Sequence, residues 1–199
     1  AASGAATVVN SGSITGTIGE GIFGNTNATV TNNVGASITG GQYGISVSTG
    51  SAFVTNSGSI TGASTYGIFA QVNAALTNNI GAAITGGDTG IFAETTTVTN
   101  FGSITGTSGV GIFAGANATV INGASGTILG GQSGIFAPNG AADVTNSGSI
   151  TGTSSSSIGT FGDATVTNNA GGSIIGTTGI FAASGAATVV NSGSITGTI

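Results

Sequence analysis

A repeat of 21 to 23 residues runs through the whole chain and constrains its fold more than any other feature. Cutting after each tetrapeptide related to GIFA gives eight units, and a ninth unit begins at residue 183. The 18 residues AASGAATVVNSGSITGTI occur at 1–18 and again at 182–199, so the eight units form a block of 181 residues. Because one such unit is too short to bury a core alone, the repeat predicts units that stack on their neighbours. The eight units are 2–24, 25–47, 48–70, 71–93, 94–114, 115–137, 138–160 and 161–182.

Three columns of aliphatic residues recur at fixed places in the units. All but one of these residues are β-branched, and each lies in a short segment such as TVTN, SITG or GIFA with glycine nearby. Segments of this composition are typical of short strands. The first column is Val8, Val30, Val54, Leu76, Val98, Val120, Val144, Val166 and Val189. The second is Ile14, Ile38, Ile60, Ile84, Ile104, Ile128, Ile150, Ile174 and Ile195, and the third is Ile22, Ile45, Ile68, Ile91, Ile112, Ile135, Ile158 and Ile180.

These columns predict an all-β fold, a single three-sided parallel β-solenoid over residues 1–199 with about eight and a half coils. Identical side chains then lie over one another about 4.8 Å apart, which explains why the same residue type returns in each coil. A β-sandwich built from hairpins needs no such repetition. Disorder is the other alternative for a chain rich in Gly, Ser, Thr and Asn, but it does not account for the columns.

A fourth column consists of asparagine, two residues after the first aliphatic column. Its members are Asn10, Asn32, Asn56, Asn78, Asn100, Asn122, Asn146, Asn168 and Asn191. The asparagine amide carries both donors and an acceptor, so stacked asparagines can hydrogen-bond to one another along a corner of the solenoid. Asparagine also tolerates a left-handed backbone, which a sharp corner could require. We predict a structural ladder from this column, with a row of ligand-binding amides as the alternative.

The segment that follows this asparagine alternates in length between odd and even units. It is short in the odd units, as in NSGSI at 10–14, and two residues longer in the even units, as in NNVGASI at 32–38. We infer that a pair of coils is the unit of evolution, which was expanded to eight coils and then duplicated as a block.

The composition of the 199 residues excludes several functions, because the chain has no Lys, Arg, His or Cys and a net charge of −5. Without cations it has nothing to neutralise phosphates, so we expect no nucleic-acid partner. Without thiolates and imidazoles we expect no metal centre of those ligands, and no other cofactor is indicated. No apolar run approaches the roughly 18 residues of a membrane span, so we expect no membrane insertion of this segment, and no signal peptide is visible.

The same composition argues against catalysis. Serine and threonine are abundant, but no His or Lys is present to activate a hydroxyl as a nucleophile. Asp143 and Asp163 lie in adjacent units on the same expected outer face, where their separation could fall in the range used by glycosidases. Two solvated surface acids are the simpler interpretation, and the Asp-rich loop of calcium-binding β-rolls is absent. We therefore expect no enzymatic activity.

Two outward-facing patterns remain as candidate contact surfaces. Threonines flank the inward valine in TVT at 29–31, 97–99 and 165–167; a regular array of this kind would favour ice binding, but other units interrupt it. Phenylalanine follows the isoleucine of the third column in six units, and strand alternation places these side chains outside. They predict a stripe for lateral contacts, unless the strand bends and buries both residues in part. The stripe is Phe23, Phe69, Phe92, Phe113, Phe136 and Phe181.

Segments such as VTNSGSITG at 54–62 and 144–152, together with the GIFA tetrapeptides, resemble the passenger repeats of large bacterial autotransporters and related surface adhesins. The resemblance covers the whole chain. It implies a right-handed parallel β-helix that is exported and displayed as a stalk or fibre. This sequence contains no translocator barrel, signal peptide or capping segment of that family.

We therefore expect a non-enzymatic, structural segment of a bacterial extracellular fibre or surface adhesin, such as those of biofilms. Its main partner would be itself, through end-to-end continuation or stacking into a filament and through lateral bundling, with surface glycans as further partners. In such a filament, the ninth coil takes the environment of the first, and the axial repeat is about 38–39 Å at the usual strand spacing. The alternative is a binding module whose solenoid face recognises a glycan, ice or a host surface.

Overall fold

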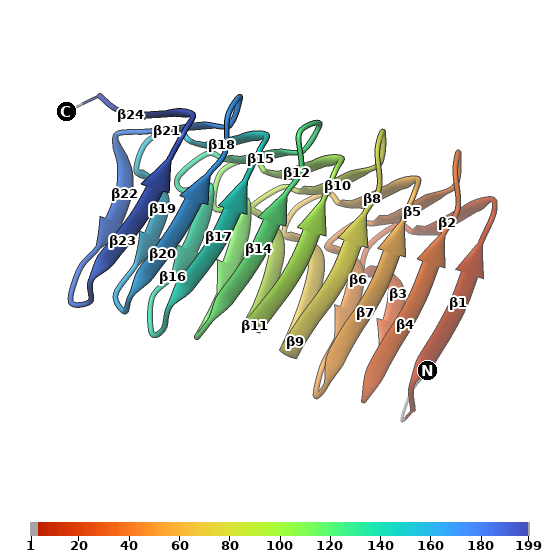
Figure 1. The fold of residues 1–199 in the computed structure, drawn as a ribbon. Coiled ribbons are helices and arrows are strands. Elements are labelled where there is room, and N and C mark those ends of the chain that lie inside the picture. Colours follow the sequence, from red (N-terminus) through yellow and green to blue (C-terminus); the bar gives the residue numbers. More distant parts are fainter. Residues whose placement is uncertain (1–3, 199) are drawn as a thin grey trace.

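The computed structural model describes residues 4–198 and consists of one parallel β-solenoid of about nine turns. Every strand pairing is parallel, and residues 4–198 contain no helix. The coils stack along one axis, and the first and last coils lie at opposite ends of the stack (Figure 1). The all-β parallel solenoid expected from the three aliphatic columns is confirmed.

Each of the first eight coils contributes one strand segment to each of three stacks, which we call the first, second and third faces, and the ninth contributes β23 and β24 to the first two. The first face contains β1 (Ala6–Asn10), β4 (Asn27–Asn32), β7 (Ser51–Asn56), the second halves of β9 (Tyr66–Asn78) and β11 (Thr89–Asn100), β14 (Ala118–Asn122), β17 (Ala142–Asn146), β20 (Ala164–Asn168) and β23 (Ala187–Asn191). The second face contains β2 (Ser13–Gly16), β5 (Ser37–Gly40), β8 (Ser59–Gly62), β10 (Ala83–Gly86), β12 (Ser103–Gly106), β15 (Thr127–Gly130), β18 (Ser149–Gly152), β21 (Ser173–Gly176) and β24 (Ser194–Gly197). The third face contains β3 (Glu20–Gly24), β6 (Tyr43–Val47), the first halves of β9 and β11, β13 (Ile112–Ala114), β16 (Ile135–Ala137), β19 (Ser156–Thr160) and β22 (Thr178–Ala182).

Equivalent residues of successive coils pair in register. Val8 pairs with Val30, and Ile14 pairs with Ile38, so each aliphatic column becomes a continuous row along the axis. Because β9 and β11 run without a break from the third face into the first, hydrogen bonding joins these two faces into a 15-stranded sheet, while the second face is a separate nine-stranded sheet.

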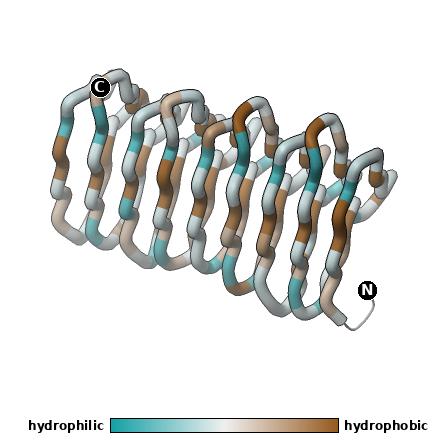
Figure 2. Tube along the Cα trace, turned by 45° about the vertical axis from the view of Figure 1, so that its right-hand side comes forward, coloured by the Kyte–Doolittle hydropathy of each residue, from teal (hydrophilic) through white to brown (hydrophobic). Residues whose placement is uncertain are grey.

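The interior of the solenoid is filled by the three aliphatic columns, and apolar residues recur at the same level of successive coils (Figure 2). A further inward column, not among those predicted, lies two residues before the first aliphatic column. It consists of alanine in every coil except the fifth, where Thr96 pairs in register with Ala74 and Ala118. The small side chain suits a fully buried position at the start of the first-face strands, where the interior is close-packed.

A column of glycines lies just before the isoleucines of the third face. A Cβ atom on Gly67 would lie 2.6 Å from the carbonyl oxygen of Gly90 and 2.8 Å from Cγ2 of Ile84. A larger residue therefore requires the next coil to move. Ser157 is the exception in this column, and its hydroxyl donates to the carbonyl oxygen of Ile150 at 2.8 Å.

The longer corner is a tight turn in the even coils, and in coils 2, 4 and 8 it contains a left-handed glycine, whereas in coil 6 Ser125 takes this position without a positive φ. In coil 2 the N–H of Ala36 donates to the carbonyl oxygen of Asn33 at 3.0 Å, and Gly35 between them has a φ of 75°. A positive φ at the third position is the mark of a type II turn and favours glycine. No residue other than glycine has a positive φ within residues 4–198, so the idea that the column asparagines adopt a left-handed backbone is wrong. The glycine of the turn takes that conformation instead.

Candidate functional site

The nine asparagines of the fourth column form one row along the corner between the first and second faces. Each Nδ2 donates to the Oδ1 of the asparagine in the next coil at 2.8–2.9 Å, without interruption from Asn10 to Asn191. The same Nδ2 also donates to a main-chain carbonyl of the next coil, as from Asn32 to Ser59 at 3.1 Å. Each coil is therefore joined to the next by two side-chain hydrogen bonds at this corner.

The side-chain amides of this row form their hydrogen bonds with other groups of the chain. The Nδ2 of Asn78 donates to Asn100 and to the carbonyl oxygen of Ser103, while its Oδ1 accepts from Asn56, and the side chain is fully buried. All eight amide–amide bonds run in the same direction, with the donor in the earlier coil. This geometry favours a structural role for the column over a row of ligand-binding amides.

A second polar column at the corner between the third and first faces joins each even coil to the following odd coil. The Oδ1 atoms of Asn27, Asn117 and Asp163 accept hydrogen bonds at 2.8–3.0 Å from main-chain N–H groups of the next coil. At the equivalent position, the Oδ1 of Asn73 accepts from the hydroxyl of Thr95 at 3.1 Å. This column was not predicted, although its signal is present in the sequence: the four residues all lie three positions before the first aliphatic column.

The second asparagine of the even coils forms a third set of contacts, directed to the preceding odd coil. The Nδ2 of Asn33 donates to the hydroxyl of Ser11 at 2.7 Å. The equivalent pairs Asn79–Ser57 and Asn169–Ser147 have the same bond at 2.8 and 2.9 Å. These bonds occur in three of the four even coils, with Gly123 in place of the asparagine in coil 6, and, like the second polar column, they follow a period of two coils, which agrees with a pair of coils as the repeating unit.

The acidic residues are dispersed over the surface. Asp143 and Asp163 are both exposed, and Asp163 has the structural role at the second polar column described above. Within residues 4–198, no three side chains of the types His, Cys, Asp and Glu gather in a way that could hold a metal ion. In the same part of the chain we find no helix that is long and apolar enough to cross a membrane.

The predicted phenylalanine stripe lies on the outer side of the third face, but its rings cover one another. Phe69, Phe92, Phe113 and Phe136 are half-buried and form a continuous row with centroids 4.6–6.0 Å apart, whereas Phe181 is more exposed. In the register of the third face, Ser46 occupies the position between Phe23 and Phe69, and Gly159 occupies the position between Phe136 and Phe181. The faces of the stacked rings are turned toward the neighbouring rings and away from solvent. The phenylalanines therefore lie on the outside of the third face, as strand alternation predicts, but they are also partly buried.

Two tyrosines extend this aromatic row, and strand alternation alone does not predict them. Tyr66 contacts Phe92 at 5.0 Å and Tyr43 at 5.6 Å between ring centroids. Each tyrosine lies two residues before an inward isoleucine, where strict alternation would place it inside. The intervening glycine also faces the core, so the alternation is broken there and the tyrosine points outward. Burial raises the pKa of the Tyr66 phenol, and the nearby Asp88 and Tyr43 raise this pKa further.

Hydroxyl groups cover much of the second face, in a more regular array than the TVT triplets of the first face. The outward positions on either side of the buried isoleucine form two columns, interrupted only by Ala83, Leu129 and Ile175. The first column contains Ser13, Ser37, Ser59, Ser103, Thr127, Ser149, Ser173 and Ser194, and the second contains Thr15, Thr39, Thr61, Thr85, Thr105, Thr151 and Thr196. The repeated four-residue strand SITG is the sequence signal of this surface, which the sequence analysis above did not predict.

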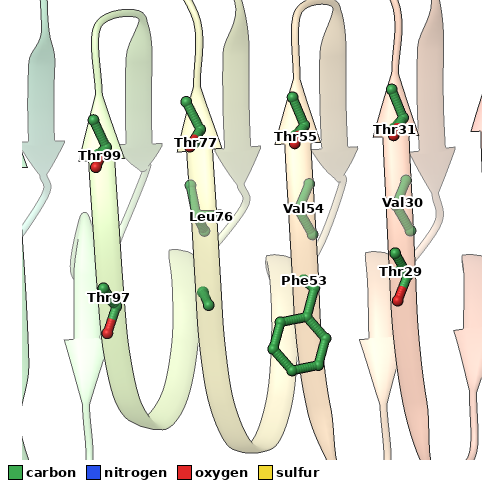
Figure 3. Close-up of a pocket in the computed structure, with 11 residues that line it drawn as sticks. Thr29, Val30, Thr31, Phe53, Val54, Thr55, Leu76, Thr77, Thr97 and Thr99 are labelled. Carbon is green, nitrogen blue, oxygen red and sulfur yellow. The ribbon is translucent and has the colours of Figure 1, made fainter.

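The first face contains a shallow hollow, which we call the Phe53 hollow. In the strand register Ala75 lies between Phe53 and Thr97, and the threonines of the next outward column line one edge of the hollow: Thr31, Thr55, Thr77 and Thr99 (Figure 3). The hollow has a volume of about 380 Å³. It exists because alanine replaces the larger residue that other coils carry at this position, as in Thr29 and Thr97.

The fold and these surfaces define a parallel β-solenoid held by polar corner ladders. Comparison with protein-family models, with curated proteins and with solved structures finds no match to this chain.

Proposed function

We propose that this chain is a rigid, repetitive stalk segment of an exported bacterial fibre or surface adhesin, located outside the cell or at the cell surface. The observation that carries the proposal is the unbroken asparagine row, in which every coil is tied to the next by the same two side-chain hydrogen bonds. A rod of this kind gains length at about 4.8 Å per coil without needing any other domain.

The duplicated sequence supports the same role. The strands β23 and β24 of the ninth coil have the same sequence as the strands β1 and β2 of the first coil, which pair with coil 2. In a longer array, a tenth coil could therefore pair with the ninth as coil 2 pairs with the first. The partner is then the chain itself, either as one long polypeptide or as protomers stacked head to tail. The absence of Lys and Arg from the 199 residues leaves no cleavage site for trypsin-like proteases, which suits an exposed fibre.

An antibody raised against residues 4–198 tests this proposal in the cells that make the protein. Immuno-electron microscopy should label thin surface fibres, and image averaging should give an axial repeat of about 38 Å, the height of eight coils. Labelling confined to the cell interior, or to compact particles without an axial repeat, would contradict the proposal.

A further inference from the structure

We propose that the first face binds a neutral saccharide at the Phe53 hollow. This inference goes beyond the stalk role and is independent of it, because a rigid rod needs no ligand on its surface. It rests on three properties of the hollow: an exposed aromatic face, a row of free hydroxyls and the absence of charge.

The ring of Phe53 exposes an aromatic face to solvent, whereas the rings of the third face cover one another. Phe53 is 46% exposed and makes no ring contact with another described residue. The ring lies flat against the strand with its face directed outward (Figure 3). The apolar C–H side of a sugar ring packs on such a face, and burying it removes apolar surface from water. The stacked rings of Phe92 and Phe113, with an interplanar angle of 2°, present no comparable face to a ligand.

Threonine hydroxyls beside the ring supply the polar contacts. Six threonines line the hollow, and none of their hydroxyls forms a hydrogen bond to another described residue. Four of these hydroxyls follow one another at the strand spacing of about 4.8 Å, and the two columns are about 7 Å apart along the strand. Each hydroxyl both donates and accepts, as sugar hydroxyls do, so the row can bond to a saccharide in more than one position. The lining threonines are Thr29, Thr31, Thr55, Thr77, Thr97 and Thr99.

The charge of the molecule specifies a neutral ligand. None of the residues that line the hollow is charged, and Asp143, the one acid in these outward columns, lies three coils beyond Ala75. The net charge of −5, with no Lys or Arg, disfavours uronate or sulfated sugars because nothing balances their charge. Ice is disfavoured as the occupant, because Phe53 and Ala75 interrupt the threonine columns and make the surface uneven.

A tryptophan placed at residue 53 reports binding through its fluorescence, since the chain contains no other tryptophan. We would screen the 199-residue chain against an array of neutral and anionic oligosaccharides and then titrate each hit into the Phe53→Trp variant. We expect a neutral oligosaccharide to bind and to change the fluorescence of this tryptophan. The matched control is Phe161→Trp, at a residue that is 48% exposed and lies outside the hollow, and its fluorescence should not change.

Two further variants test which side chains carry the binding. Phe53→Ala should weaken the affinity by about tenfold or more, and Thr77→Val by about three- to tenfold, with circular dichroism and melting temperature unchanged. The proposal is overturned if no neutral saccharide binds, if anionic sugars bind instead, or if Phe161→Ala weakens binding as much as Phe53→Ala. Ice shaping by the chain without saccharide binding would also overturn it.

Discussion

The ring of Phe101 lies against Gly123 of the next coil, in the space where any side chain at residue 123 would have to lie. Elsewhere the equivalent positions hold a serine and an asparagine that hydrogen-bond to each other, as Ser57 and Asn79 do at 2.8 Å. A large residue in one coil is thus matched by the loss of a side chain in the next. Such a compensation is expected only if these two coils are neighbours in this register.

A double-mutant cycle at this pair tests the register. Gly123→Asn should lower the free energy of unfolding by about 1–3 kcal/mol, because the new side chain overlaps the Phe101 ring. In the background of Phe101→Ser, the same change should cost less than about 0.5 kcal/mol, since it recreates the serine–asparagine pair. Urea denaturation of the four proteins gives the coupling energy. An equal cost of Gly123→Asn in both backgrounds would show that the two residues do not meet.

Removing one amide from the middle of the asparagine row should destabilise the solenoid strongly. Asn78→Ala removes the donor to the Oδ1 of Asn100 and to the carbonyl oxygen of Ser103 in a buried corner, while the Nδ2 of Asn56 keeps only its main-chain acceptors. Each orphaned polar group costs about 1–3 kcal/mol, so we expect a loss of about 3 kcal/mol in urea denaturation. The control is Asn139→Ala, an exposed asparagine whose side chain makes no hydrogen bond within the described residues, where the change should stay within about 0.5 kcal/mol. Similar losses in the two variants would refute a stabilising row.

The buried hydroxyl of Thr96 is a defect that substitution should repair. Thr96 is 2% exposed in the alanine column, and its Oγ1 has no hydrogen-bond partner. Thr96→Val keeps the shape and removes the unsatisfied group, so it should raise the free energy of unfolding by about 1 kcal/mol. Thr119→Val, at an exposed position of the next coil, controls for strand propensity and should have little effect. A loss of stability in Thr96→Val would mean that the hydroxyl has a partner, such as a buried water.

Stability should change little across neutral pH and decline at high pH. The chain has no His or Cys, so it lacks the side chains that ordinarily titrate between about pH 6 and 9. The pKa of Tyr66 is raised above 10.0 in the folded chain, chiefly by burial. The stability linked to this group is therefore complete below pH 10 and is lost as the pH rises through the folded pKa. Melting temperatures of wild type and Tyr66→Phe should agree at pH 7 and diverge above pH 10, with the wild type lower; parallel declines would contradict this.

The sequence was sufficient to predict what repeats with the period of the coil. Stacked coils need the same residue type at the same place, so the recurrence of residues equivalent to Val30, Ile38 and Ile45 predicts three buried columns, and the structure confirms them. The features that the sequence analysis did not predict are those that do not repeat in every coil or that break the alternation of a strand. The contacts of Asn33 and Asn117 occur once in two coils, and Tyr66 points outward because the glycine after it breaks the alternation.

The Phe53 hollow illustrates a different limit. It depends on one small residue, Ala75, beside one large residue, Phe53, and a column-by-column comparison treats both as interruptions of a threonine pattern. Only the packing of neighbouring coils reveals that the two interruptions together form a surface. A repeat therefore predicts the scaffold better than it predicts the sites that vary upon it.

The length of chains with one, two and three blocks tests most directly whether the solenoid is a rigid stalk. Since residues 182–199 repeat residues 1–18, placing residues 1–181 before the whole chain adds eight coils without a new junction. Small-angle X-ray scattering should show a maximum dimension that increases by about 38 Å with each block, at about 4.8 Å per coil, while the cross-section stays constant. An increase that falls off with each block, or a cross-section that grows, would show a flexible or collapsed chain and contradict the account.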